Sequence, residues 1–250
     1  MSMPTLVAHR GNAAEFPENT LPALDSAVAL GLRHVEFDVQ LARDRVPVLL
    51  HDADLSRVGG RPERIFDLDW SDFARLPVGE PGRLGPEFAA TLPSSLEQAV
   101  DWLGGRPGVT AFVEVKRASL RHFGMPAVIE QVIAKLRPVL EQAVLISFDL
   151  PCLLHARAES AARIGWVLTQ YDDASRLEAR AAAPEFLFCN HERLPPDGSQ
   201  LWSGPWEWAL YEVRDVDTAR TLRERGAAYA ETMAVRTMLA ACASAGNPRG

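Results

Sequence analysis

A chain of 250 residues, 47% hydrophobic and 24% charged, can form one large α/β domain or two small ones. Its net charge of −7 argues against a general nucleic-acid or anionic-membrane binder, although a local cation can still draw an anionic small molecule into one pocket. Its three cysteines lack C-x-x-C spacing, the N-terminus has no leader pattern, and no apolar run reaches the roughly 18 residues of a membrane span, so we expect a cytoplasmic protein with no membrane span.

Apolar β-type runs alternate with amphipathic stretches nearly to the end of the chain. The predicted strands are Thr5–Ala8, His34–Val39, Val46–Leu50, Thr110–Val115, Ala143–Phe148, Arg163–Leu168, Glu185–Cys189, Ala209–Val213 and Ala227–Ala230. The predicted helices are Leu21–Leu30, Ser95–Leu103, Pro126–Leu140, Pro151–Ser160, Asp172–Ala182 and Val216–Arg225. Continuous apolar strands separated by helices are typical of a parallel sheet covered by helices on its outer face.

One connection is too short for a parallel crossover. Only a few residues separate Val39 from Val46, so these two strands are predicted to form a hairpin. With the turn near Asp44-Arg45, we expect Asp38 to face His51. Without the return strand, eight strands remain in β/α alternation, which predicts a (β/α)8 TIM barrel with its chemistry at the C-terminal strand ends.

The stretch 52–93 interrupts the alternation. It is rich in Gly, Pro, Asp and Arg and follows the His51-Asp52 pair directly. We expect it to be a small insertion over the barrel mouth that shapes substrate access. Because no linker or internal repeat divides the sequence, residues 1–250 are predicted to form a single barrel domain.

Three carboxylates are predicted to meet at one end of the sheet. Glu36 and Asp38 are two residues apart on a strand, so their side chains point to the same face, and Glu114 lies near the end of another predicted strand. Two such carboxylates would repel each other without a cation between them. An oxygen-only ligand set suits Mg2+ or Ca2+, and less well Mn2+, whereas zinc prefers nitrogen and sulfur.

Two histidines and two basic side chains complete this edge. His9 and His51 are the candidate acid–base pair, because an imidazole titrates near neutrality. Arg10 offers a planar fork for phosphate and Lys116 a point charge. A divalent metal with these groups describes hydrolysis of a phosphate ester. Four further residues are candidates for the pocket wall: Glu18, Asn19, Phe148 and Tyr211.

The ordered set of short motifs resembles the glycerophosphodiester phosphodiesterase family. The motifs are His9-Arg10-Gly11, Pro17-Glu18-Asn19-Thr20, Glu36-x-Asp38, His51-Asp52 and Glu114-x-Lys116, with weaker matches at Leu92-Pro93-Ser94-Ser95-Leu96 and Ser147-Phe148-Asp149. The resemblance implies a (β/α)8 barrel that, with water, cleaves a small-molecule glycerophosphodiester to sn-glycerol 3-phosphate and an alcohol, and therefore a place in lipid and glycerol metabolism. It also implies the roles of the site residues: Glu36, Asp38 and Glu114 as metal ligands, His9 and His51 as the acid–base pair, and Arg10 and Lys116 as phosphate contacts. Which histidine is the acid and which the base is left open.

Two late segments depart from the usual pattern of this family. Tyr211-Glu212-Val213-Arg214 stands where Trp-Thr-Val-Asn is common, and 228–233 keeps the threonine of Asp-Gly-Ile-Ile-Thr-Asp but neither aspartate. If Glu212 and Glu231 point inward, they would favour a cationic or polyhydroxy head group. The sequence leaves the head-group alcohol, the physiological metal and the oligomeric state unassigned.

Two alternatives to this function remain. The first is a lysophospholipase D-like hydrolase of lysophospholipids on the same barrel with a more apolar mouth. The second is a catalytically silent barrel that binds anionic metabolites, which would tolerate loss of His9 or His51. The chain keeps both histidines.

Overall fold

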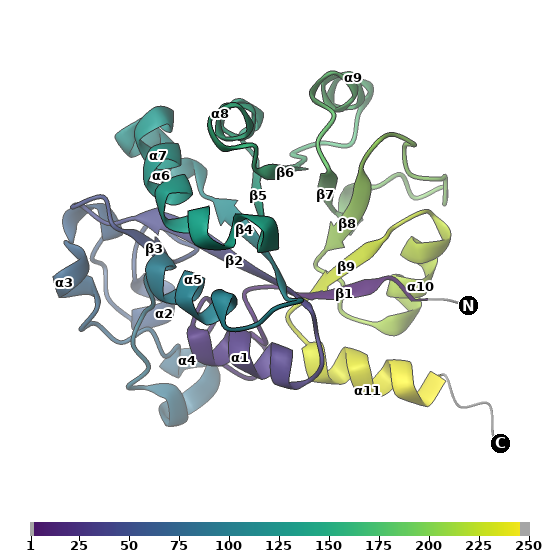
Figure 1. The fold of residues 1–250 in the computed structure, drawn as a ribbon. Coiled ribbons are helices and arrows are strands. Elements are labelled where there is room, and N and C mark those ends of the chain that lie inside the picture. The colour runs from purple at the N-terminus through teal and green to yellow at the C-terminus, as the bar shows by residue number, and fades with distance from the viewer. Residues whose placement is uncertain (1–2, 246–250) are drawn as a thin grey trace.

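The computed structural model describes residues 3–245, in which parallel strands form a closed barrel surrounded by helices (Figure 1). The strands are β1 (Thr5–Ala8), β2 (His34–Leu41), β3 (Pro47–Leu49), β4 (Thr110–Val115), β5 (Ala143–Ser147), β6 (Arg163–Val167), β7 (Phe186–Asn190), β8 (Glu207–Tyr211) and β9 (Tyr229–Thr232). Strands β1, β2 and β4 to β9 pair in parallel around a ring that closes between β1 and β2, at Ala8 and Val35. The predicted eight-stranded (β/α)8 barrel is confirmed.

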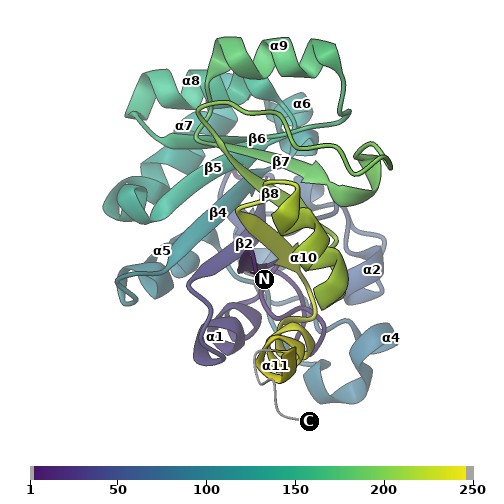
Figure 2. The ribbon, with the colours of Figure 1, turned by 90° about the vertical axis from the view of Figure 1, so that its right-hand side faces the viewer.

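Helices follow most of the barrel strands and cover the barrel from outside (Figure 2). The α-helices are α1 (Leu21–Ala29), α2 (Ser56–Gly59), α3 (Trp70–Phe73), α4 (Pro81–Leu84), α5 (Leu96–Gly104), α6 (Arg117–Phe123), α7 (Met125–Leu136), α8 (Leu150–Ser160), α9 (Asp173–Ala182), α10 (Val216–Glu224) and α11 (Val235–Ala245). The 3-10 turns are η1 (Ile65–Asp67), η2 (Gly85–Phe88), η3 (Arg137–Gln142) and η4 (His191–Arg193). The predicted helix 126–140 is therefore two pieces, α7 and η3. The sequence prediction omitted α6 and α11.

Two hydrophobic cores divide the barrel into an inside and an outside. The larger core lies between strands and outer helices, and includes Leu24, Val35 and Leu187. A smaller core fills the barrel interior with Phe112, Phe188 and their neighbours. Adjacent residues of one strand thus contribute to opposite cores, as the two-residue period of a strand requires. The interior core closes the barrel below the polar strand ends, so it forms the floor of the candidate site.

The β2–β3 hairpin is confirmed, but its predicted register is wrong by one residue. Val39 pairs with Leu49, and the amide of Leu50 donates to the carbonyl oxygen of Asp38 at 3.1 Å, so Asp38 faces Leu50 rather than His51. The cause is the turn, because Arg45 adopts a left-handed conformation (φ 64°) and the connection between Ala42 and Val46 holds three residues.

The segment between β3 and α5 has its own small hydrophobic core. Leu55, Ile65 and Phe73 are fully buried there and pack with residues of the hairpin, including Val48. In Figure 1 its short helices α2, α3 and α4 lie at one side of the barrel. This packing fixes residues 52–93 against the N-terminal strands.

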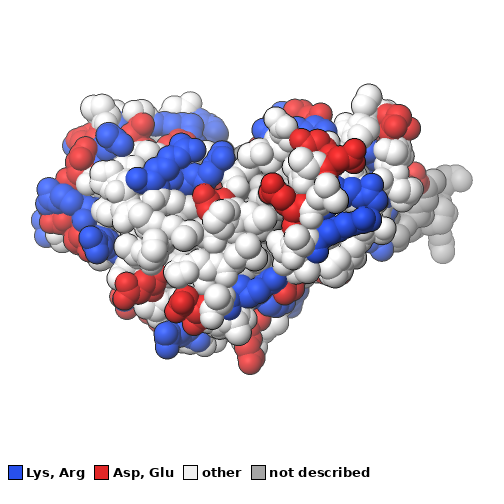
Figure 3. All heavy atoms as spheres, turned by 90° about the horizontal axis from the view of Figure 1, so that it is seen from above, with Lys and Arg blue, Asp and Glu red and all other residues white. Residues whose placement is uncertain are grey.

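The surface carries charges of both signs. On the face shown in Figure 3, small basic and acidic groups are interspersed, with uncharged areas between them. Within residues 3–245, no helix combines the length and apolar character required to cross a bilayer.

Candidate active site

Most of the polar residues singled out in the sequence line one cavity of about 210 Å3 at the C-terminal strand ends. His9 follows β1, Glu36 lies on β2, and Lys116 follows β4. Asp38 of β2 pairs in register with Glu114 of β4, so the two carboxylates are neighbours across parallel strands. The cavity is lined by His9, Arg10, Glu36, His51, Glu114, Lys116, Ile146, Phe148, Val167, Phe188, Tyr211, Glu212 and Glu231.

Three carboxylates form a compact acidic cluster. Glu36, Asp38 and Glu114 each place one oxygen so that all three oxygens lie within 4.8 Å of one another. Burial raises the pKa of Glu36 and of Glu114. Glu36 Oε1 is buried and has no hydrogen-bond partner in the part of the chain that the structure describes. An orphaned carboxylate oxygen beside two others fits a hard divalent cation.

The ammonium group of Lys116 lies between two of these carboxylates. Its Nζ donates to Glu114 Oε1 at 2.8 Å and to Asp38 Oδ1 at 3.1 Å. Burial alone would lower the pKa of Lys116, but Asp38 and Glu114 outweigh it and raise that pKa above its usual value. The lysine therefore stays charged and is available to a phosphate.

Asn19 positions Asp38 and does not line the cavity. Its amide Nδ2 donates to Asp38 Oδ2, and the backbone N–H of Asp38 donates to Asn19 Oδ1, both at 2.8 Å. Arg10 Nε also lies 3.2 Å from Asp38 Oδ2. Burial would raise the pKa of Asp38, but Lys116 and Arg10 hold it well below its usual range. Asp38 is thus a fixed, ionised carboxylate.

A tight turn after β1 places Arg10 at the rim. Arg10 has φ 57°, its backbone N–H donates to Glu36 Oε2 at 2.9 Å, and its guanidinium donates to Glu18 at 3.0 Å. Gly11 follows with φ 79°, and a Cβ there would lie 2.6 Å from the backbone of Ala23. Gly11 is therefore required by the backbone of this turn.

The two histidines have different surroundings. His9 Nε2 lies 3.9 Å from Glu36 Oε2, and burial, with Arg10 beside it, lowers the pKa of His9 to about 3. His51 Nδ1 lies 2.7 Å from Asp52 Oδ1. Burial lowers the pKa of His51, although the charge of Asp38 opposes this. Both rings are neutral near pH 7, and Asp52 fixes the orientation of His51.

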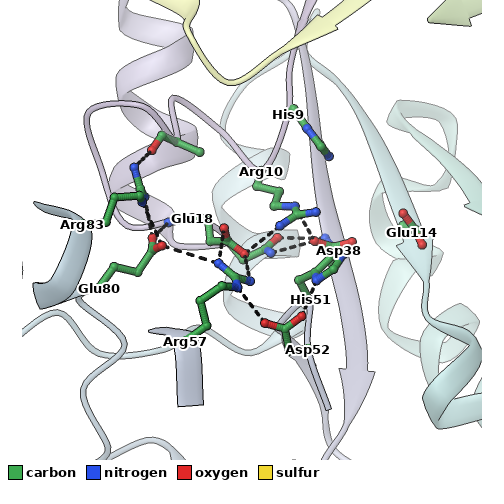
Figure 4. Close-up of polar contacts among 12 residues, drawn as sticks. His9, Arg10, Glu18, Asp38, His51, Asp52, Arg57, Glu80, Arg83 and Glu114 are labelled. Carbon is green, nitrogen blue, oxygen red and sulfur yellow. Dashed lines mark hydrogen bonds and ion pairs between the residues drawn. The ribbon is translucent and has the colours of Figure 1, made fainter. Parts of the chain in front are cut away.

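An ion-pair network joins the segment 52–93 to the rim (Figure 4). Arg57 binds Glu18 with two hydrogen bonds of 2.7 and 2.8 Å, and it also donates to Asp52 at 2.8 Å. Glu80 accepts from the backbone N–H of Glu18 at 2.8 Å and is paired with Arg83. The carboxylate of Glu18 is thus hydrogen-bonded within this network. Contrary to the sequence interpretation, it does not line the cavity. No local sequence signal pointed to Arg57 or Glu80.

The opposite wall of the cavity comes from later strands. Phe148 and Tyr211 line it, as the sequence predicted. Glu231 of β9 and Glu212 line it as well, so both point inward. Burial, with Glu114 and Asp38 nearby, raises the pKa of Glu231. Glu212 accepts from Arg214 at 3.1 Å.

Comparison with known proteins places this site in a family. The chain matches the glycerophosphoryl diester phosphodiesterase family over residues 9–185, and it belongs to that family. This stretch contains every predicted metal, histidine and phosphate position.

Three similar proteins illustrate the relationship. Glycerophosphodiester phosphodiesterase 1 of Mus musculus is 35% identical over 111 residues, which are 44% of this chain and 33% of that protein. The glycerophosphodiester phosphodiesterase of Caldanaerobacter subterraneus is 29% identical over 147 residues, 58% of each protein. An Oleispira antarctica phosphodiesterase, solved in complex with the product sn-glycerol-3-phosphate, shares the fold with a TM-score of 0.81 at 19% identity, covering 96% of this chain and 97% of that one. The matched part of this chain thus spans between a third and three-fifths of the two relatives compared by sequence.

Proposed function

We propose that this chain is a phosphodiesterase that hydrolyses glycerophosphodiesters to sn-glycerol 3-phosphate and an alcohol, with help from a divalent cation. The observation that carries the proposal is the convergence of three carboxylates, two histidines and two basic side chains at one barrel end. We assign residues 1–250 to a single catalytic domain in the cytoplasm, with 52–93 as an insertion at the barrel mouth. Its partner is the small-molecule substrate.

The cation would be held by Glu36, Asp38 and Glu114. Their all-oxygen set suits Mg2+ or Ca2+ and would also accept Mn2+. When bound, the cation polarises a phosphoryl oxygen and favours the charge that develops there. Arg10 and Lys116 lie beside the cluster and would bind the remaining phosphate oxygens.

The histidines would transfer the protons. Because Asp52 holds Nδ1 of His51, the other ring nitrogen, Nε2, carries the free lone pair and serves as the proton acceptor from the nucleophile, a water molecule or the neighbouring glycerol hydroxyl. Asp52 then stabilises the resulting imidazolium. His9 lies beside Glu36 and is neutral in the free site, so it would first take up a proton, which the negative charge of a bound phosphodiester favours, and would then donate that proton to the leaving alcohol oxygen. The phosphorus–oxygen bond to the alcohol breaks as the nucleophile bonds to phosphorus. Attack by water gives glycerol 3-phosphate directly, whereas attack by the glycerol hydroxyl gives a cyclic phosphate that a water molecule must then open.

A second candidate substrate class is a lysophospholipid. A groove of about 470 Å3 continues past Phe148, which lines both spaces, and it has an apolar lining from Leu120, Met125 and Trp166. An acyl chain would fit such a groove while the phosphodiester lay at the acidic cluster. Charged residues of both signs also line this groove, namely Arg117, Arg121, Asp149 and Glu178, so a polar part of the occupant could bind there as well.

The test is release of glycerol 3-phosphate from a panel of glycerophosphodiesters, with EDTA and with re-added Mg2+, Ca2+ or Mn2+. Metal-dependent release would support the proposal and rank the head groups. Release of choline from lysophosphatidylcholine alone would favour the second class. A protein that binds metal but releases nothing from either class would contradict both and support a silent binding barrel.

Metal binding is expected to release protons and to strengthen as pH rises. Burial raises the pKa of Glu36 and Glu114 above the usual 4.5, so these groups bind protons that a cation must displace. The dependence should therefore extend above pH 4.5, where ordinary glutamates are already ionised, and fade once both groups have ionised in the folded protein. Calorimetry in buffers of different ionisation enthalpy, at about pH 6 and about pH 8, should show more proton release at the lower pH. A pH-independent dissociation constant without proton release would contradict this prediction.

A further inference from the structure

Glu231 is a buried carboxylate that the proposed reaction does not use. It lies on β9, is 3% exposed and faces the cavity. Its Oε1 has no hydrogen-bond partner within residues 3–245. Buried polar groups in proteins are nearly always paired, and a buried carboxylate without a partner is costly. We therefore look to a ligand for the missing hydrogen-bond or ion-pair partner of Glu231.

The charges around the cavity indicate what that ligand carries. Four carboxylates, Glu36, Asp38, Glu114 and Glu231, stand against two cations, Arg10 and Lys116. A divalent cation at the acidic cluster would neutralise the excess of two negative charges. A phosphodiester then adds one negative charge that nothing in this set offsets. A substrate that brings its own positive charge keeps the buried site neutral.

The other acidic residues at the rim contact basic side chains. Glu18 and Asp52 share Arg57, Glu80 is paired with Arg83, and Glu212 is paired with Arg214. Glu231 is buried next to the acidic cluster, and its side chain forms no ion pair with any of the described basic side chains. Its charge is the one left for a substrate cation.

Glu231 lies on β9, between the strand that leads to Arg10 and the strand that ends at Tyr211. On one side it is opposite Val7 of β1, and on the other side β9 pairs with β8. Tyr211 and Glu231 come directly after the paired residues Leu210 and Ala230, and both side chains line the cavity. A carboxylate beside an aromatic ring is a suitable receptor for an ammonium group.

We propose that Glu231, together with Tyr211, binds an ammonium group on the alcohol part of the substrate and so selects zwitterionic glycerophosphodiesters. This inference rests on the proposed phosphodiesterase function. It names the preferred substrates as those with an ethanolamine- or choline-type alcohol, and it assigns specificity to a residue outside the acidic cluster.

The test compares kcat/KM for glycerophosphoethanolamine and glycerophosphocholine with that for glycerophosphoglycerol, in the wild type and in Glu231→Gln. We expect the ratio of zwitterionic to neutral-alcohol substrate to fall about 30-fold or more in the variant, because one partner of a buried charge pair is lost. Glu212→Gln is the matched control, since Glu212 lines the same wall but is paired with Arg214. Its ratio should change less than about threefold, as for a solvent-exposed pair.

Several results would overturn the inference. If kcat/KM fell equally for all substrates and their ratio stayed unchanged, Glu231 would act on the shared glycerophosphate or on the metal. Weaker Ca2+ binding by the variant in calorimetry would identify the metal. An equal shift in Glu212→Gln would show a general field effect. If the wild type cleaves none of the substrates, the proposed function fails, and calorimetric binding of glycerophosphocholine to the Ca2+-loaded protein still tests Glu231. Affinity unaffected by Glu231→Gln would then overturn the inference separately.

Discussion

Replacing His51 or His9 with alanine is expected to lower kcat by a factor of about 100 to 10,000, the usual contribution of a positioned acid or base. In the proposed scheme each histidine handles one proton, so neither compensates for the other. His51 is oriented by Asp52 at 2.7 Å, and its loss removes the proton acceptor. His9 is buried beside Glu36, and its loss removes the proton donor. Stopped assays of glycerol 3-phosphate release would measure both effects.

The control for these variants is His155→Ala. His155 is a partly exposed residue of α8 that does not line the cavity. It should leave kcat unchanged, and all three variants should keep the circular dichroism spectrum and the Ca2+ affinity of the wild type. A wild-type rate in either active-site variant would remove that histidine from the mechanism and would revive the silent-barrel alternative.

Replacing Glu114 with glutamine is expected to weaken Mg2+ or Ca2+ binding at least about 100-fold, because a ligand should matter no less than the outer-shell partners whose loss costs 10- to 100-fold. Glutamine keeps the size of the side chain and can still accept from Lys116, which donates to Glu114 at 2.8 Å. The change therefore removes charge with little change in packing. Turnover at limiting metal should fall in parallel and recover in part when the metal concentration is raised.

Isothermal titration of the metal-free protein would measure this effect directly. Glu97→Gln is the comparison, since Glu97 is an exposed carboxylate paired with Lys135 and remote from the cluster. Unchanged metal affinity in Glu114→Gln would exclude Glu114 from the ligand set and leave Glu36 and Asp38 to be tested in the same way.

Much of the site could be predicted because a parallel barrel brings all its strand ends to one rim. His9, Glu36 and Glu114 are far apart in the sequence, yet each comes at or near the end of an apolar strand. The alternating strand and helix patterns predicted a barrel, and the barrel geometry then predicted which residues lie close together. Strands β1 and β4 were predicted with their observed boundaries.

The errors arose where tertiary contacts outweigh local patterns. The hairpin register depended on the left-handed conformation of Arg45, a position where no glycine or asparagine indicated it. The last strand extends to Thr232, although its prediction ended at Ala230, because Glu231 is an unusual residue in a buried strand. The pairing of Arg57 with Glu18 spans 39 residues and has no sequence signature.

The network around Glu18 also has a dynamic consequence. Residues 52–93 are attached to the rim through Arg57 and through Glu80, whose carboxylate accepts from the Glu18 amide in a buried position. Opening this segment like a lid would expose several buried charges at once, which makes such an excursion rare compared with ordinary loop motion. The cavity is therefore expected to be formed before substrate binds, because these contacts hold its rim in place. The positions of the side chains at this site are therefore set by the fold before a ligand binds.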